Sequence, residues 1–285
     1  MTLAIQDHFA DPILDNLPIR EIDIDNRGNS SELTDYQVDV DVSNHIDQQG
    51  VRFVDENLQI IDYWEEDTDT IWAEIPKIIG SKVSAIRMMH GDIYNTSDGE
   101  ATFEFFDDFE DGDISDWSVV TGGSNTYNAN NYYLYDTGDT GCAVISHEIN
   151  SISNFAFAFR FYPETPTASD TRPGVSADAN PHPDYGYHVW IADSGILRLY
   201  SPSQTTIVDG LWSQLAKWYD MQFIKYGTSF ELFIDGASQG TGSNSEEDIM
   251  HYIRLEGSSV TGRPARYDNV RVRKYTSPEP TAVIA

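Results

Sequence analysis

The sequence has one cysteine, few basic residues and no long apolar run. Cys142 has no partner among the 285 residues, which excludes a disulfide scaffold. No run of about 18 apolar residues occurs, which argues against a membrane-spanning helix and membrane insertion. Residues 1–7 lack basic side chains and contain Asp7, so we expect no secretory signal peptide. With 17 Lys+Arg against 47 Asp+Glu, the chain would repel nucleic acid.

The hydrophobic content is nevertheless that of a folded protein. Hydrophobic residues make up 40% of the chain and aromatic residues 12%, which argues against disorder despite the net charge of −30. The length is enough for one large domain or two ordinary ones, each with a substantial core.

The acidity has a distinctive composition, with 31 Asp, 16 Glu, 12 Arg and only 5 Lys. A compact protein with this charge repels itself in dilute salt, whereas at 1 M salt the Debye length falls to about 3 Å. The composition therefore favours a protein from an extreme halophile. The alternative is an ordinary acidic extracellular protein.

Period-two alternation dominates the chain. Apolar residues alternate with polar ones from Tyr36 to Val42, and phenylalanines occupy every second position from Phe155 to Phe161. Short helical turns are expected only at residues 6–16, 211–216 and 245–249. Many short strands separated by turns predict an all-β protein with two β-sandwich-type domains.

A shift in composition near residue 106 divides the chain. We expect an N-terminal arm over 1–17, a first β domain over 18–106, a second over 107–275 and an extended, proline-rich tail over 276–285. The arm either docks onto a neighbouring subunit or packs on its own domain.

Residues 18–106 resemble an uncharacterised domain family of archaeal and bacterial surface proteins. The resemblance is carried, in order, by residues 20–26 (REIDIDN), 33–38 (LTDYQV), 51–53 (VRF), 62–65 (DYWE), 70–76 (TIWAEIP) and 97–103 (SDGEATF). One departure is at residues 88–91 (MMHG), where the family has tyrosines before the glycine. This change implies altered packing in the same fold.

Residues 107–275 are similar to a concanavalin-like (laminin-G-like) β-sandwich, a jelly roll. The similarity lies in residues 107–117 (DDFEDGDISDW), 218–223 (WYDMQF), 230–236 (FELFIDG) and 267–272 (YDNVRV). The two resemblances imply a binding or architectural role, and they bring no catalytic residues to carry over.

One acidic segment is similar to a motif of concanavalin-like glycoside hydrolases. Glu21, Asp23 and Asp25 alternate along a predicted strand, and paired carboxylates on one face suit glycosidic cleavage. The segment lies outside the sandwich, however, and its last position is Asp instead of Glu. We therefore expect a solvated strand face and a protein that is not an enzyme.

An acidic turn at the start of the second domain supplies several hard oxygen ligands within seven residues. Ca²⁺ binds six to eight such oxygens, and the laminin-G-like resemblance implies that the last strand lies close to the first. The turn is a candidate site for a structural Ca²⁺, and the other interpretation is a solvated acidic turn. The candidate ligands are Asp107, Asp108, Asp111, Asp113 and Asp268.

Aromatic residues gather near a long irregular stretch, 163–185, that is rich in proline. Flat aromatic rings beside polar side chains suit stacking on sugar rings. The alternative is sandwich core and rim, because Tyr187 and Trp190 face opposite sides of a strand. The candidate ligand-binding residues are Tyr132, Tyr133, Asp184, Tyr185, Tyr187 and Trp190.

Together these features lead to one functional hypothesis. We expect a non-enzymatic, exposed component of a haloarchaeal virus particle, such as a capsid turret, spike or tail fibre. Its partners would be other virion proteins, further copies of itself and a host surface glycan or glycoprotein, and its location the virion surface. The alternatives are a cell-surface adhesin or envelope module of a halophilic archaeon and, third, a glycoside-processing enzyme.

Overall fold

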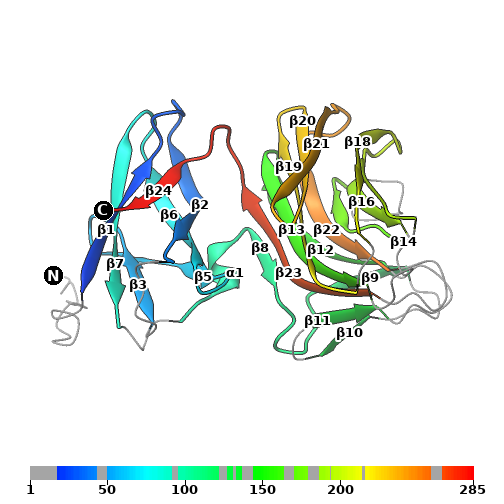
Figure 1. Ribbon diagram of the computed structural model, residues 1–285, viewed down its shortest axis with the longest axis horizontal. Coiled ribbons are helices and arrows are strands. Elements are labelled where there is room, and N and C mark those ends of the chain that lie inside the picture. Colours follow the sequence, from blue (N-terminus) through cyan, green and yellow to red (C-terminus); the bar gives the residue numbers. More distant parts are fainter. Residues whose placement is uncertain are drawn as a thin grey trace, which may run out of the picture. The chain divides into compact units, whose positions relative to one another are not determined.

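The chain folds into two compact units (Figure 1). Phe103–Thr276 form one unit, and the chain before and after this segment forms the other. The computed structural model describes residues 18–43, 50–91, 96–121, 127–130, 133–136, 144–163, 170–178, 186–192, 194–213, 216–257 and 265–285. The arm expected over 1–17 lies outside the described residues.

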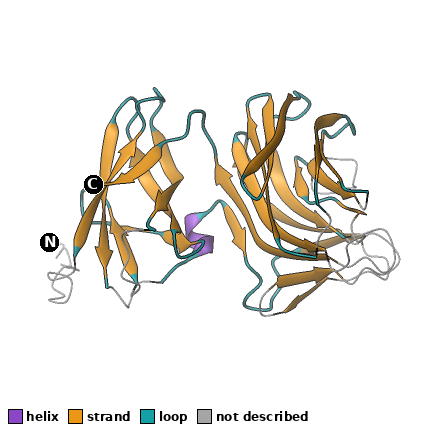
Figure 2. Cartoon of the chain, viewed as in Figure 1, coloured by secondary structure: helices purple, strands orange, loops and turns teal. Residues whose placement is uncertain are grey.

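Strands account for nearly all regular structure (Figure 2), and the predicted all-β fold class is confirmed. Among the described residues one helix occurs, α1 (Gly99–Thr102), and no helix is long and apolar enough to cross a membrane. Asp98 caps α1 by accepting a hydrogen bond from the Ala101 N–H at 3.0 Å. This helix was not predicted from the sequence.

The predicted helical turns have different outcomes. Residues 6–16 lie outside the described part of the chain, and Leu211 ends a strand. The prediction at 245–249 is wrong. Its polar groups bind other segments, because Glu246 accepts hydrogen bonds from Ser203 and the Glu247 N–H donates to the Tyr187 hydroxyl.

The first unit contains two antiparallel sheets over a shared hydrophobic core. Buried residues such as Ile22, Val38 and Phe53 come from both sheets. One sheet has the order β24-β1-β7-β3-β4 and the other β2-β6-β5. The strands are β1 (Ile19–Asp25), β2 (Leu33–Asp41), β3 (Val51–Val54), β4 (Ile60–Ile61), β5 (Tyr63–Glu65), β6 (Thr70–Ile78), β7 (Val83–His90) and β24 (Thr281–Ile284).

The C-terminal segment belongs to this first unit. The sequence predicts extended chain over 276–285, and the structure shows that this chain forms β24, which pairs antiparallel with β1 from Ile22↔Ile284 to Asp25↔Thr281. The Ala285 N–H donates to the Glu21 carbonyl at 2.9 Å. The second unit is therefore inserted, in sequence, between α1 and β24 of the first.

The second unit is a two-layer β-sandwich. The sheet that contains β13 has the order β10-β11-β23-β13-β19-β20-β21, with β8 also paired to β23; we name it the β13 sheet. Its strands are β8 (Phe105–Asp107), β10 (Tyr127–Asn130), β11 (Tyr133–Asp136), β13 (Phe155–Pro163), β19 (Tyr219–Tyr226), β20 (Ser229–Ile234), β21 (Ala237–Ser243) and β23 (Ala265–Lys274).

The opposite layer, the β16 sheet, has the order β18-β17-β16-β15-β22-β12-β9, with β14 also paired to β16. Its strands are β9 (Ser118–Thr121), β12 (Val144–Ile152), β14 (Asp170–Thr171), β15 (Gly174–Ser176), β16 (Tyr187–Ala192), β17 (Ile196–Tyr200), β18 (Thr206–Leu211) and β22 (Met250–Glu256).

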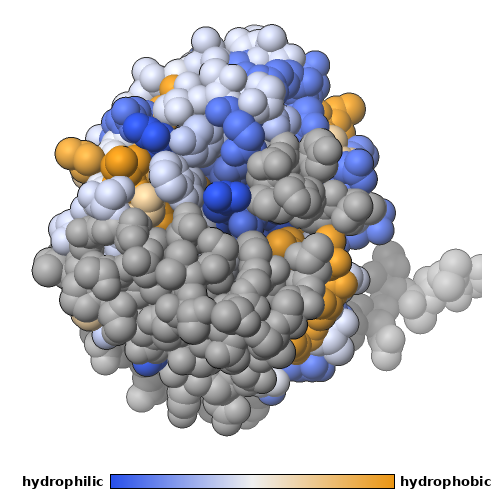
Figure 3. Space-filling model, turned by 90° about the vertical axis from the view of Figure 1, so that its right-hand side faces the viewer, coloured by the Kyte–Doolittle hydropathy of each residue, from blue (hydrophilic) through white to orange (hydrophobic). Residues whose placement is uncertain are grey.

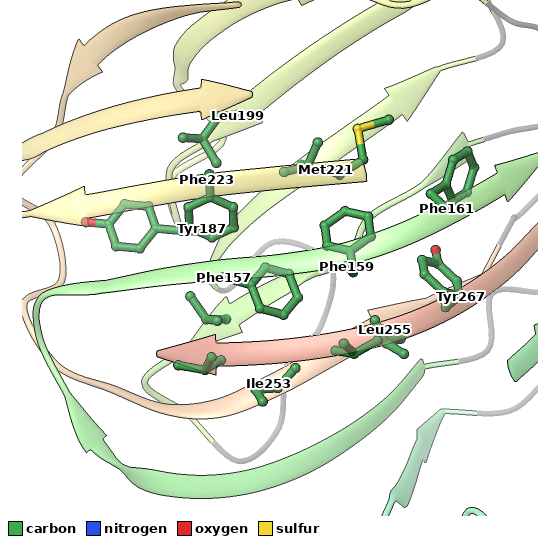
Figure 4. Packing of buried hydrophobic residues seen from close by; sticks show 14 of the residues in the cluster. Phe157, Phe159, Phe161, Tyr187, Leu199, Met221, Phe223, Ile253, Leu255 and Tyr267 are labelled. Atoms are coloured by element: carbon green, nitrogen blue, oxygen red, sulfur yellow. The ribbon is translucent and has the colours of Figure 1, made fainter. Parts of the chain in front are cut away.

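Aromatic side chains fill the space between the two layers (Figure 4). Phe155, Phe157, Phe159 and Phe161 of β13 are each at most 1% exposed, as their alternation predicts. Phe157 and Phe223 meet edge to face with their ring centres 5.5 Å apart. Residues of β16, β17 and β22 complete the core from the other layer, so these strands turn their alternate residues outward.

Candidate ligand-binding face

The outward face of the β16 sheet carries a cluster of aromatic and charged side chains. Along β16, Tyr187, Val189 and Ile191 are fully buried in the core. His188 and Trp190 therefore face the opposite side, because successive residues of a strand alternate between faces. Figure 3 shows the side of the molecule on which β14, β16 and β18 lie, where the described residues are mostly hydrophilic with small hydrophobic areas.

One row of side chains crosses this face perpendicular to the strands. Trp190 pairs with Arg198, and Arg198 pairs with Asp209 on the next strand. On the other side, the pairs Thr171↔Ile191 and Gly174↔His188 place Arg172 across from Trp190. The Arg172 N–H then donates to the carbonyl of Glu256 at 3.3 Å. We name Asp209, Arg198, Trp190, Arg172 and Glu256 the Trp190 row.

Both arginines of the Trp190 row are held by carboxylates. Arg198 Nε donates to Asp209 Oδ1 at 2.7 Å, and its guanidinium carbon lies 5.9 Å from the centre of the Trp190 ring. The hydrogen bonds to Asp209 and the Tyr200 hydroxyl raise the pKa of Arg198 above its usual value. Arg172 Nη1 lies 3.6 Å from Glu256 Oε1. Trp190 is thus flanked by one oriented guanidinium on each side.

The row is open at one end and closed at the other. The side chain of Asp209 is 63% exposed, and those of Arg198 and Arg172 are 30% and 29% exposed. Trp190 is half-buried, whereas the Glu256 side chain is only 3% exposed. The side chains of Arg172, Trp190 and Arg198, which are neighbours in the row, are therefore each partly buried and partly exposed to solvent.

A second row lies beside the first and supports it. It contains Tyr200, His188, Gly174, Arg254 and Ser146, which are paired from strand to strand across the β16 sheet. His188 and Arg254 are fully buried, and Arg254 Nη2 lies 3.6 Å from Glu256 Oε2. The His188 ring stacks on Tyr200 with the ring centres 5.5 Å apart. This row fixes the positions of Tyr200 and Glu256, which contact the arginines of the Trp190 row.

His188 has a defined protonation state. Its Nδ1 lies 3.1 Å from the carbonyl of Gly186, which can only accept, so Nδ1 carries the hydrogen. Burial, followed by the charges of Arg254 and Arg172, holds the pKa of His188 well below its usual value, so the ring is neutral. Nε2 is then a buried acceptor, and no donor among the described residues reaches it.

Gly174 allows the two strands beside His188 to approach closely. A Cβ atom at this position would lie 2.2 Å from the Tyr187 carbonyl oxygen and 2.8 Å from the His188 Cβ. Only glycine permits this packing, which sets the distance between β15 and β16 and therefore between Arg254 and His188.

The arrangement has the chemistry of a sugar-binding surface. A partly exposed indole ring can stack on the C–H face of a sugar, arginines can donate hydrogen bonds to its oxygens, and carboxylates can accept from its hydroxyls. Tyr200 adds a second ring, with its centre 6.0 Å from that of Trp190. Trp190, Arg198, Tyr200, Asp209 and Glu256 are on strands, which hold them more rigidly than loops would, and Arg172 lies between the short strands β14 and β15.

The structure places the predicted ligand-binding residues in different locations. Trp190 lies at the centre of the row, and Tyr187 packs in the core, the alternative left open for one of the two. The Tyr187 hydroxyl lies 2.9 Å from Asn244 Oδ1, and burial raises its pKa to about 12. Tyr133 is in β11 of the β13 sheet. Tyr132, Asp184 and Tyr185 lie outside the described residues.

Several residues of the face were not predicted from the sequence. Arg198 and Tyr200 carry a readable signal, because Leu197 and Leu199 alternate with them and are fully buried. Arg172 and Glu256 carry none, since these two residues are far apart in the sequence and meet only because β15 pairs with β22.

The predicted calcium ligands lie at the end of β8, in the turn that follows it and on β23. Asp107 pairs with Val270, so the first and last strands of the sandwich are neighbours. Each acid of the turn accepts a hydrogen bond from the backbone N–H two residues further on, which is the geometry of an Asx turn; these acids are Asp107, Asp108, Asp111 and Asp113.

Two of these carboxyls are unusual. Trp117 Nε1 donates to Asp107 Oδ2 at 2.6 Å, and Arg160 Nη1 donates to Asp268 Oδ2 at 3.1 Å. Burial raises the pKa of both Asp107 and Asp268 to about 6. In the part of the chain that the structure describes, no group of three or more His, Cys, Asp or Glu is arranged to hold a metal ion. The calcium site stays a prediction.

The acidic strand of the first unit is solvated. Glu21 and Asp23 are exposed. Asp25 forms hydrogen bonds with the Arg27 side chain and backbone, which lower its pKa to about 2. A general acid for glycosidic cleavage needs a raised pKa, and that of Asp25 is shifted in the opposite direction.

Comparisons with known proteins concern the family of one segment and the fold. The family model described as "Domain of unknown function (DUF2341)" matches residues 47–120. A search of the curated proteins found no match.

Among solved structures, a sialidase gives a TM-score of 0.50 at 10% identity, covering 70% of this chain and 20% of the sialidase chain. The present chain thus spans about a fifth of that protein. The carbohydrate-binding module CBM66 from Bacillus subtilis gives 0.46 at 15% identity, covering 56% of this chain and 97% of the module. A Bacillus subtilis protein of unknown function with a galectin-like fold gives 0.43 at 14% identity, covering 56% and 90%. At these identities the similarity concerns the fold.

Proposed function

We propose that the protein is a non-catalytic glycan-binding protein and that the outward face of the β16 sheet holds the glycan. The observation that carries the proposal is the Trp190 row, in which a partly exposed indole ring lies between two arginines that are themselves held by Asp209 and Glu256. The two-layer sandwich fold of the second unit is compatible with this role.

The groups of the row match the surface of a sugar. A pyranose has an apolar C–H face and a rim of hydroxyls that both donate and accept hydrogen bonds. Trp190 provides the flat apolar contact for one ring, and the arginine–carboxylate pairs provide donors and acceptors for the hydroxyls of the glycan on either side of that ring. In concentrated salt, long-range steering is screened, so affinity arises from these short-range contacts and from multivalency.

The test is a glycan-array screen followed by calorimetry in concentrated KCl, with W190A and a matched control. Trp218 is also a partly exposed tryptophan of the sandwich, next to β19 of the other sheet, so W218A tests for nonspecific loss. We expect W190A to lower affinity at least about tenfold, equivalent to about 1.4 kcal/mol, and W218A to bind like wild type. Circular dichroism checks that both variants fold.

Two results would overturn the proposal. One is the absence of binding by the wild type to any glycan of the array, and the other is equal binding by W190A and wild type. The same samples, incubated with the bound glycan and analysed by chromatography for released sugar, test whether the protein is an enzyme. Turnover that disappears with a carboxylate substitution would favour the glycoside-processing alternative.

For the biological setting, we propose an exposed structural component of a haloarchaeal virus particle, a capsid turret, spike or tail fibre located on the virion surface. The composition supports a halophilic source. Its partners would be other virion proteins, further copies of the same chain and a host glycan or glycoprotein. Antibody labelling in electron micrographs tests this: label on particles supports it, and label confined to cell envelopes supports an adhesin or envelope module instead.

A further inference from the structure

We infer that the ligand is a linear oligosaccharide of at least three sugars that crosses the strands of the β16 sheet, with its central ring on Trp190 and its neighbouring sugars against Arg198 and Arg172. This inference rests on the proposed function, and it adds the size and direction of the ligand.

The geometry of the Trp190 row sets the direction. The row spans five strands from Asp209 to Glu256, and with neighbouring strands about 4.8 Å apart its length is about 19 Å. Arg198 and Arg172 each lie one strand spacing from Trp190, on opposite sides. One pyranose is about as wide as one strand spacing, so a single ring on Trp190 leaves both guanidiniums beside its neighbours.

The direction along the strands offers no comparable surface. The residues that share the outward face of β16 with Trp190 are His188 and Ala192, which are 0% and 2% exposed. A glycan that ran along β16 would therefore contact only one solvent-facing side chain of that strand. Across the strands, three consecutive positions face solvent.

The arginines are preorganised for such a ligand. Arg198 is held by Asp209 at 2.7 Å and by the Tyr200 hydroxyl at 3.4 Å, and Arg172 is anchored by its backbone and side-chain contacts with Glu256. A guanidinium that is already oriented loses little side-chain entropy when it binds. Each flanking sugar should therefore add affinity to the contact on Trp190.

The end of the row at Asp209 is open and that at Glu256 is closed, since their side chains are 63% and 3% exposed. A chain longer than three sugars would continue past Asp209 toward solvent. Affinity should consequently increase strongly up to three sugars and change little beyond.

The test uses the full chain and a length series, from one to five sugars with one linkage, of a glycan that the array identifies. Affinities are measured in concentrated KCl by calorimetry, and by ligand-observed NMR for weak members. We compare wild type with W190A, R198A, R172A and the control R27A, which removes an exposed arginine of the first unit that also pairs with an aspartate. R198Q is included in case R198A does not fold.

We expect wild-type affinity to rise about tenfold or more from one sugar to three, and to level off afterwards. R198A and R172A should each weaken the trisaccharide several-fold, with the monosaccharide unchanged within about twofold. W190A should weaken every length, and R27A none.

Other outcomes separate the two proposals. Absence of wild-type binding to every glycan overturns the proposed function. Equal wild-type affinity for one and three sugars, with both lost in W190A, leaves glycan binding in place and overturns the present inference. Equal weakening of all lengths by R198A or R198Q also overturns it, because the arginine would then contact the same sugar as Trp190.

Discussion

Two carboxyls of the sandwich, Asp107 and Asp268, should make its stability decrease as pH rises. Both have pKa values raised to about 6 in the folded protein, with burial as the largest cause. An unfolded aspartate has a pKa of about 3.9. Between these values the folded state binds more protons than the unfolded state. The free energy of unfolding therefore falls from about pH 4 to pH 6 and levels off above, where both states are ionised.

The magnitude follows from the size of the shift. A shift of about two pKa units changes the free energy of unfolding by about 3 kcal/mol per group. This value is an upper limit for groups that have some contact with solvent. Asp268 is only 8% exposed, whereas Asp107 is less deeply buried, so the larger share belongs to Asp268. Allowing for screening, we expect the pair to change the stability by about 2–4 kcal/mol across this pH range.

The assay is urea unfolding at constant high KCl, followed by tryptophan fluorescence at half-unit steps from about pH 4 to pH 8. The double variant D107N/D268N should lose most of the pH dependence. Its stability at a single pH is less informative, because the substitutions also weaken the hydrogen bond from Trp117 and the ion pair with Arg160. The control D116N/E148Q removes two exposed acids of the same unit. An unchanged pH dependence in D107N/D268N would refute the reasoning.

Three further predictions concern stability. Dialysis to about 0.1 M salt should unfold the protein, because carboxylates up to about 10 Å apart then repel each other. A circular-dichroism spectrum that stays that of the folded protein would contradict the halophilic interpretation. Removal of residues 277–285 should destabilise the first unit by several kcal/mol in urea unfolding. The reason is that Ala282 and Ile284 pack on its core and the Tyr36 hydroxyl donates a hydrogen bond to Glu279. An unshifted unfolding midpoint would show that β24 is dispensable. G174A should lower the free energy of unfolding by about 1–3 kcal/mol in thermal unfolding, because its new Cβ would contact the Tyr187 carbonyl. The control is G227A, at a glycine with a positive φ of 56° but no atom near the position of the added Cβ, and it should lower the free energy of unfolding by less. Equal losses would refute the packing argument.

Local patterns in the sequence predicted local structure well. The phenylalanines from Phe155 to Phe161 alternate, and each of them points into the core. The family resemblance predicted the sandwich fold, and the alternation around Trp190 predicted that Tyr187 and Trp190 lie on opposite faces of a strand. The segment 245–249 shows the limit, because its helix-compatible residues bind Ser203 and Tyr187, which lie about 40 and 60 residues away in the sequence.

Features that depend on pairing between distant strands could not be predicted. Arg172 and Glu256 meet only because β15 runs between β16 and β22, and no single segment encodes this order. The same holds for β24, whose partner β1 is more than 250 residues earlier. Strand register is set by the packing of a whole face, which a reading of one segment at a time does not contain.

The pairing of β24 with β1 also has a mechanical consequence. The two strands are antiparallel neighbours, so the chain enters the first unit and leaves it at the same end of the pair, with the sandwich inserted between them. Tension applied through both ends of the chain would peel β24 away from β1 one hydrogen bond at a time. The sandwich would carry no load until this strand had separated. The first unit would then extend under a pulling force while the sandwich stays folded.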